Sequence, residues 1–291
     1  MPQAEGAMRI RDLGTVTGRL LVFGAPHSNA RATAALFETA EAMNVTPRNM
    51  LCTGDIVGIG AGPAETIEQL HAAGVPVVKG DCDAHLAWSG AESISCADMG
   101  PQGAARTAAW HQYATTHVKQ AVRERLATLP DHIRFQHRGK RYVAIHGGAQ
   151  RRTAFLWPTV SDATLAAEIS ALKSQHGRVD GVICGHSGLA FERIVSGVRW
   201  INSGSVGLPA HDGNPQTRFA TLEPSGEIVF HRLSYDHDAE RQAMIEADLT
   251  HGYEDTLVTG RWPVESGLPP ELRWAAKPVF TPEDDVQARS A

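Results

Sequence analysis

The sequence predicts an α/β fold with a largely parallel core. Three strand–loop–helix units follow one another, with strands that begin near residues 18, 49 and 75. Such a succession is typical of parallel strands joined by helices. Each of these strands ends in a polar cluster, and parallel strands carry such clusters to one edge of a sheet. The second half is richer in strands joined by short turns, which predicts additional antiparallel strands.

Apolar runs and helix formers place the elements of the first half. Residues 18–24 form an apolar run that ends in glycine, which predicts a buried strand. The polar residues 1–17 before it are either a loose lead-in or a short first strand. Farther along, the pattern predicts strands over 49–56 and 75–79, helices over 30–43, 64–73 and 104–129, and a Gly/Ser/Cys-rich loop over 89–103.

Turn residues organise the second half. Arg138-Gly139-Lys140 separates two strands over 133–136 and 141–145, which is a hairpin pattern. The remaining pattern predicts a strand over 181–184, hairpins over 191–202 and 217–233, and helices over 162–172 and 238–248. We expect a single domain over residues 1–260 and a Pro-rich C-terminal extension over 261–291.

Composition excludes several classes of function. A net charge of −5 argues against a nucleic-acid-binding protein, which would carry a basic face. The four cysteines have no CxxC spacing, and Cys52 and Cys184 lie in apolar runs, as expected in a reducing compartment. No signal peptide or membrane-spanning run is evident, so we expect a cytoplasmic protein without a membrane partner.

Five strand ends offer side chains that bind metals. Asp55 could merely cap a turn, since Gly-Asp pairs are common in turns. It is joined, however, by one aspartate and three histidines that also follow predicted strands: Asp81, His27, His146 and His186. Carboxylates and imidazoles are the ligands of divalent cations such as Zn, Mn or Fe. The shared placement favours a metal site over five separate structural roles.

The order of these segments resembles the calcineurin-like metallophosphoesterase superfamily, whose motifs run DxH, GD, GN(H/C), a strand ending in His, and GHxH. The corresponding segments are Ala25-Pro26-His27, Gly54-Asp55, Gly80-Asp81-Cys82, His146-Gly147 and Gly185-His186-Ser187-Gly188. The stretch 202–207 is similar to the N-x-G-S-V-G turn of that family. The resemblance implies a four-layer α/β/β/α sandwich of two mixed β-sheets flanked by helices, with metals at the strand ends.

The departures from the family pattern bear on the metal count. Ala25 stands where the family has the Asp of DxH, and Gly188 stands where it has the last His. The resemblance therefore implies a degenerate first metal site and one surviving ion, although two are not excluded by the residues. The implied ligands of that ion are Asp55, Asp81, His146 and His186.

Three further residues receive roles from the same comparison. Cys82 replaces the general-acid His of the family, and a thiol is a poor proton donor to an alkoxide beside imidazolium. Cys82 could be a soft metal ligand or a filler, and we favour a filler or a residue that supports the ligands. For Asn202 we expect either a supporting role behind the ligands or a place at the rim of the site. His27 is the remaining candidate for catalytic acid–base work.

Two functions remain open at this point. The leading hypothesis is a metal-dependent phosphoesterase that hydrolyses a phosphomonoester or phosphodiester with a metal-activated water. The alternative is a catalytically weakened homologue that binds a metal and a phosphate-bearing ligand or protein partner. Either way we expect a small phosphorylated substrate or ligand. Arg151 and Arg152 could meet phosphate oxygens, although an exposed pair is the simpler interpretation.

Overall fold

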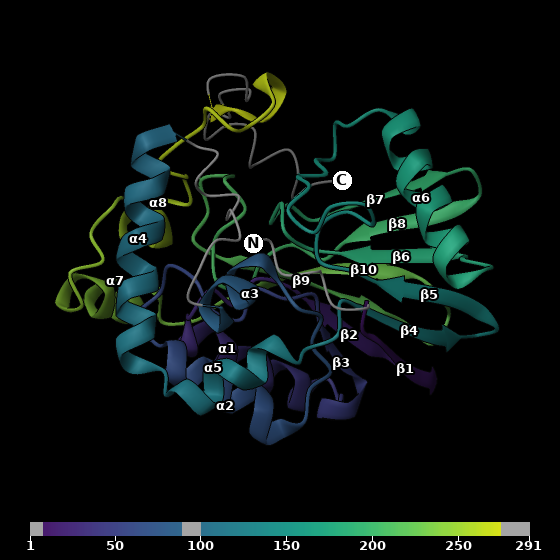
Figure 1. Cartoon of the computed structure of the whole chain (residues 1–291), viewed down its shortest axis with the longest axis horizontal. Coiled ribbons are helices and arrows are strands. Elements are labelled where there is room, and N and C mark those ends of the chain that lie inside the picture. The colour runs from purple at the N-terminus through teal and green to yellow at the C-terminus, as the bar shows by residue number, and fades with distance from the viewer. Residues whose placement is uncertain (1–7, 89–99, 275–291) are drawn as a thin grey trace, which may run out of the picture.

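The computed structural model describes residues 8–88 and 100–274. Its ten strands form two sheets (Figure 1). The six-stranded sheet has the order β1-β4-β5-β6-β8-β7, and the four-stranded sheet has the order β10-β9-β2-β3. The strands of the first sheet are β1 Ile10–Thr15, β4 His132–His137, β5 Lys140–Ala144, β6 Gly181–Cys184, β7 Phe191–Val195 and β8 Val198–Asn202. Those of the second are β2 Leu20–Phe23, β3 Met50–Cys52, β9 Thr217–Leu222 and β10 Ile228–Leu233.

Helices cover the outer face of each sheet. One helix, α6 Asp162–His176, packs on the six-stranded sheet through Leu165, Ile169 and Leu172. The other helices lie with the four-stranded sheet: α1 Ala30–Ala42, α2 Pro63–Ala73, α3 Asp81–Ala87, α4 Gly100–His117, α5 Gln120–Ala127, α7 His237–Glu246 and α8 Tyr253–Thr259. Short 3-10 turns occur at Pro47–Asn49 and Pro270–Leu272.

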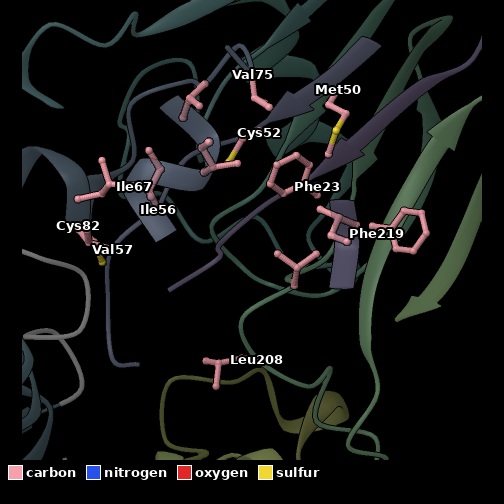
Figure 2. Packing of buried hydrophobic residues seen from close by; sticks show 14 of the residues in the cluster. Phe23, Met50, Cys52, Ile56, Val57, Ile67, Val75, Cys82, Leu208 and Phe219 are labelled. Atoms are coloured by element: carbon pink, nitrogen blue, oxygen red, sulfur yellow. The ribbon is translucent and has the colours of Figure 1, made fainter. Parts of the chain in front are cut away.

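Alternation along the strands explains why four layers form. Leu20 and Val22 of β2 point into the cluster between the sheets, whereas Leu21 and Phe23 point into the cluster beneath the helices. Successive side chains of a strand project to opposite faces, so both faces of β2 must be covered. Figure 2 shows Phe23 with Met50, Cys52 and Phe219 in the helix-side cluster. The predicted four-layer α/β/β/α fold is confirmed.

Several expected elements differ from those observed. The strand expected over 75–79 is a single bridge between Cys52 and Val77, because Pro76 has no N–H to extend a ladder. The helix expected over 104–129 is two helices, α4 and α5. The chain turns to extended backbone at Lys119, after a run that includes Thr115, Thr116 and Val118, which are weak helix formers.

The remaining differences lie at the edges of elements. Residues 10–15 form a strand, β1, that pairs in parallel with β4, so the segment before β2 contains a short first strand. Of the loop expected over 89–103, residues 100–103 belong to α4 and 89–99 lie outside the described residues. The expected hairpins β4–β5, β7–β8 and β9–β10 are confirmed as antiparallel pairs. None of the described helices is long and apolar enough to cross a membrane.

Candidate metal centre

The candidate site lies where strand ends of both sheets meet. Strands β2 and β3 are parallel in one sheet, and β5, β6 and β8 are parallel in the other. Asp55 follows β3, His146 follows β5 and His186 follows β6. The clusters that follow the first three predicted strands share the edge of the four-stranded sheet, as expected. His146 and His186 do not share that edge, because they come from the six-stranded sheet, and the carboxyl ends of the two stacked sheets face one cavity.

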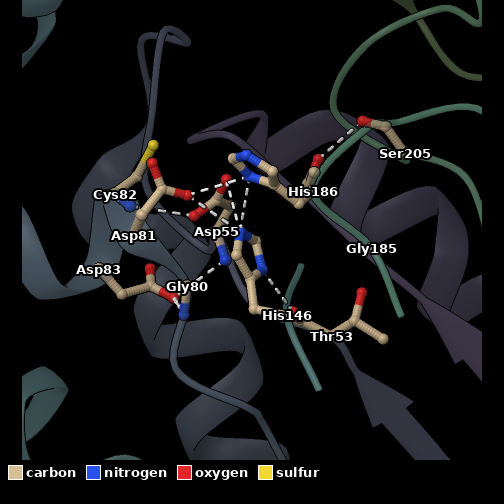
Figure 3. A network of polar contacts seen from close by, with 12 residues as sticks. Thr53, Asp55, Gly80, Asp81, Cys82, Asp83, His146, Gly185, His186 and Ser205 are labelled. Carbon is tan, nitrogen blue, oxygen red and sulfur yellow. Dashed lines mark hydrogen bonds and ion pairs between the residues drawn. The ribbon is translucent and has the colours of Figure 1, made fainter. Parts of the chain in front are cut away.

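Four predicted ligands converge on one point (Figure 3). His146 Nε2 lies 3.0 Å from Asp81 Oδ1, 3.0 Å from His186 Nδ1 and 3.4 Å from Asp55 Oδ2. His186 Nδ1 lies 3.1 Å from Asp81 Oδ1, and all four side chains are buried. Ligand atoms about 2.0–2.2 Å from a tetrahedral ion lie roughly 3.3–3.6 Å from one another, so these atoms, 3.0–3.4 Å apart, need to separate only slightly to hold a divalent cation.

The chemistry of the donor set supports the same conclusion. Burial opposes ionisation of Asp81, yet the facing imidazoles of His186 and His146 hold its pKa well below the usual range. Burial also disfavours a charged His146, but the carboxylates of Asp55 and Asp81 raise its pKa well above the usual value. Two carboxylates and two imidazoles that face one another in a buried space attract a positive charge, which is what a metal site requires.

Backbone conformation helps to present these side chains. Ala25, His27, Asp55 and His186 all have positive φ, between 47° and 60°. Non-glycine residues rarely adopt this conformation, and it gathers at functional sites. Close packing matters as well, because a Cβ on Gly80 would lie 2.1 Å from Asp55 Oδ1. Only glycine at position 80 lets α3 approach Asp55 so closely.

Asp83 is a buried residue that the sequence did not single out. Its carboxylate accepts hydrogen bonds from the backbone N–H groups of Asp55 at 2.9 Å, Gly80 at 2.9 Å and Val57 at 3.2 Å. It thereby fixes the loop that carries Asp55 against the start of α3. Burial and the nearby Asp55 carboxylate raise the pKa of Asp83 to about 7.

The structure brings His27, Asp55 and Cys82 together as a second group. Ligand atoms of these three residues lie within 4.8 Å of one another. Burial lowers the pKa of His27, and its Nδ1 is a buried atom without a hydrogen-bond partner. The Cys82 backbone N–H donates to Asp55 Oδ1 at 3.0 Å. Three donors are fewer than the four that a closed site uses.

Asn202 supports the loop that presents His186. Its Nδ2 donates to the Gly185 carbonyl at 2.6 Å and to Ser187 Oγ at 2.9 Å, on either side of His186. Its Oδ1 accepts from the Gly204 N–H at 2.9 Å. Asn202 is fully buried, so it acts on the geometry of this loop and does not lie at a solvent-facing rim.

Other polar residues considered from the sequence lie elsewhere. Arg152 pairs with Asp131 at 2.9 Å, and neither Arg151 nor Arg152 lines the cavity beside the ligands. His211 is buried, with 2% of its surface exposed, and its Nε2 lies 2.7 Å from Glu265 Oε1 in the C-terminal segment. Because His211 and Glu265 are 54 residues apart, the sequence around position 211 gives no local signal of this contact.

Comparison with known proteins agrees with this geometry. A family model described as calcineurin-like phosphoesterase superfamily domain matches residues 19–227. A hypothetical protein from Pyrococcus horikoshii OT3 has a similar fold, with a TM-score of 0.71 and 18% identity, over 83% of this chain and 98% of that one. A metallophosphoesterase from Sphaerobacter thermophilus gives a TM-score of 0.64 and 22% identity, over 84% of this chain and 100% of that one. A comparison with curated proteins found no significant match.

Proposed function

Since the chain belongs to the calcineurin-like phosphoesterase superfamily, we propose that it is a phosphoesterase that hydrolyses a phosphomonoester or phosphodiester at one divalent metal site. The convergence of Asp55, Asp81, His146 and His186 on one buried point carries this proposal. These residues would hold Zn, Mn or Fe. A cation bound there would polarise a phosphoryl oxygen and lower the pKa of a water for attack on phosphorus.

His27 is the proposed proton acceptor. Its imidazole lines the same cavity as Asp55 and His186, and its pKa is lowered by burial, so it is neutral at pH 7. A neutral imidazole can take a proton from an attacking water. A Cβ on Gly58 would lie 2.5 Å from His27 Nδ1, so the loop after Asp55 packs directly against this ring. That contact restricts the ring to one side of the cavity.

The site lacks two groups of the family pattern. Position 25 carries no carboxylate, and position 82 is a cysteine where the family has its general-acid histidine. Ala25 offers only its backbone, whose carbonyl accepts from the Gly207 N–H at 2.9 Å and from Ser205 Oγ at 2.9 Å. The group formed by His27, Asp55 and Cys82 therefore has no fourth protein ligand from this strand end. We propose that one ion is bound tightly, and that Cys82 packs at the cavity wall.

A metal titration read beside turnover tests the proposal. We expect one tightly bound ion per chain and hydrolysis of p-nitrophenyl phosphate or bis(p-nitrophenyl) phosphate that depends on Zn, Mn or Fe. Asp81→Ala should lower both metal affinity and turnover by at least roughly 100-fold, because it removes a ligand. Asp238→Ala is the matched control, since the Asp238 side chain is 82% exposed.

The same experiment separates the two functional hypotheses. A protein that binds one ion tightly but turns over neither ester with any of the three metals would support a binding role and refute the esterase. Turnover that persists in Asp81→Ala at wild-type rates would place the chemistry outside this cluster.

A further inference from the structure

A cavity with an unusual lining opens beside the metal cluster. It has a volume of about 100 Å³, and Asp55, His186 and His27 line one part of it. Most of the rest of the wall is apolar or aromatic, with Phe155, Trp157, Trp262 and the aliphatic side chains Leu208, Val264 and Leu268, and Ser187, Ser205 and Tyr253 also line it. An apolar site with a few convergent polar groups is the usual form of a small-molecule site.

The aromatic residues form a continuous wall from the cluster outward. The Phe155 ring stacks on the His186 imidazole with centroids 4.3 Å apart. Trp157 lies parallel to Phe155 with centroids 5.0 Å apart, and Trp262 follows at 6.4 Å from Trp157. A flat ring that entered the cavity would meet ring faces and edges within the range at which aromatic groups attract one another.

Trp262 occupies the space beside Gly188. A Cβ on Gly188 would lie 3.8 Å from Cζ2 of the Trp262 indole, so a side chain at position 188 would project toward this ring. The Trp262 indole therefore occupies the part of the cavity that a longer side chain at position 188 would reach. What remains beside the ligands is an apolar surface, with no further coordinating group from position 188.

Several hydrogen bonds fix Trp262 in this position. Its backbone N–H donates to His211 Nδ1 at 2.8 Å, and its indole N–H donates to the Pro209 carbonyl at 2.8 Å. Because His211 Nδ1 accepts, Nε2 carries the hydrogen and donates to Glu265 Oε1 at 2.7 Å. The wall is thus ordered before any ligand arrives, which lowers the entropic cost of binding.

We propose that this cavity is a leaving-group subsite for a single aromatic ring, so that the substrate is an aryl ester of phosphate. The assignment rests on the proposed function, since the phosphate would lie at the cluster and the ring against Trp262. The volume of about 100 Å³ is of the order of the ~150 Å³ apolar cavity that holds one benzene ring. Neither Lys nor Arg lies among the cavity-lining residues of the described chain, so a leaving group with several negative charges, such as a second phosphate, is disfavoured.

The chemistry of hydrolysis agrees with an aryl ester. Water oxygen attacks phosphorus and its proton passes to the neutral His27 imidazole, the ester P–O bond breaks, and the electron pair of that bond leaves on the phenolic oxygen. Phenols have a pKa of about 10, so an aryl oxide departs without prior protonation far more readily than an alkoxide does. Because an aryl oxide needs no proton from the protein, Cys82 can lie beside Asp55 in this cavity without acting as a general acid.

Binding and turnover are tested separately. Calorimetry on the metal-loaded protein with phenylphosphonate and methylphosphonate measures the contribution of the ring, and we expect roughly tenfold tighter binding of the phenyl compound. Benzyl and ethyl phosphate are both alkyl esters with leaving alcohols of similar acidity, so the ratio of their kcat/KM values reports the binding of the ring apart from leaving-group acidity. Both should react more slowly than phenyl phosphate, and the benzyl ester should be favoured over the ethyl ester by a similar factor. Equal affinities for the two phosphonates would overturn the subsite.

Substitutions in the cavity wall test where the phenyl ring of the ligand binds. Trp262→Leu and Trp157→Leu should each remove most of the phenyl preference while methylphosphonate affinity is retained. Phe230→Leu is the matched control, because Phe230 is 38% exposed on β10 and does not line the cavity. Thermal melting checks that each variant is folded. If Trp262→Leu does not fold, Trp157→Leu and the comparison of the two phosphonates on the wild-type protein still test whether the ring binds in this cavity. Folded variants that keep the full preference would refute the location.

The outcomes distinguish this inference from the proposed function. Tight phenylphosphonate binding without hydrolysis of any ester would refute the esterase and leave the subsite standing. Hydrolysis of benzyl and ethyl phosphate at equal kcat/KM, with equal phosphonate affinities, would refute the subsite and leave the esterase standing. Failure of both phosphonates to bind the metal-loaded protein would refute both.

Discussion

The backbone carbonyl of Thr53 lies 2.7 Å from Nδ1 of His146. A carbonyl oxygen can only accept a hydrogen bond, so Nδ1 carries a hydrogen and Nε2 is the ring nitrogen that faces Asp81, Asp55 and His186 and that would coordinate an ion. A hydrogen bond of this kind fixes the ring and its tautomer for metal binding. The interaction joins the end of β3 in one sheet to the end of β5 in the other.

This relationship predicts that His146 is required for metal-linked stability. A metal at 100 times its dissociation constant should stabilise the wild-type protein by about 2.7 kcal/mol, and His146→Ala should lose most of this gain. Thermal melting with and without Zn or Mn measures the effect. His251→Ala is the control, because His251 is exposed. An equal metal-induced shift in His146→Ala would show that the ion binds elsewhere.

Cys82 provides a direct test of the metal count. If a single ion is held by Asp55, Asp81, His146 and His186, Cys82→Ser should keep one metal per chain, as measured by elemental analysis after gel filtration. Two ions in the wild-type protein that fall to one in Cys82→Ser would instead identify His27, Asp55 and Cys82 as a second site. Because a thiolate is a strong ligand for Zn, a bound thiolate would not be replaced by serine without loss of affinity.

Asp83 should be essential for the loop that carries Asp55. Asp83→Asn places an amide NH₂ where the carboxylate accepts from backbone N–H groups, so at least one buried donor loses its partner. We expect a loss of about 1–3 kcal/mol in the free energy of unfolding, measured by urea denaturation, and weaker metal binding. Asp238→Asn should change neither. A stable Asp83→Asn protein with normal metal affinity would contradict this account.

His132 should make stability depend on pH well away from the metal cluster. Burial, with the neighbouring His176, lowers the pKa of His132 in the folded protein to about 4, below its usual value of 6.5. Below pH 6.5 the unfolded chain therefore takes up a proton that the folded chain does not. The free energy of unfolding should fall as the pH drops from about 6.5 to about 4, by up to about 3 kcal/mol from this residue.

The substitution His132→Gln isolates this contribution. It should flatten the pH dependence over that interval, as measured by urea denaturation at a series of pH values. His251→Gln, at an exposed position, should leave the wild-type profile unchanged. Identical profiles for His132→Gln and the wild-type protein would assign the acid sensitivity to other groups. The hydrogen bond between His132 Nδ1 and His176 Nε2, at 2.8 Å, makes some loss at neutral pH expected as well.

Much of the fold and of the ligand set could be predicted because its signals are local. The continuous apolar run Leu20–Phe23 indicates a strand buried on both faces, and the glycines beside Asp55 and His186 mark strand ends that carry side chains. The prediction failed where neighbours decide the outcome. Val75–Lys79 is apolar enough for a strand, but it pairs with β3 only through one bridge, between Cys52 and Val77.

The sequence by itself determined the order of the elements and the residues at the strand ends, because periodicity and turn chemistry act over a few residues. Only the tertiary structure decided that these ends belong to two stacked sheets, since pairing between distant strands is not encoded in either strand alone. It also decided that Asp83 holds the Asp55 loop and that His211 fixes Trp262, contacts that join residues 28 and 51 positions apart. The aromatic wall beside the metal cluster exists because packing brings residues 155–157 and 262 to the same cavity.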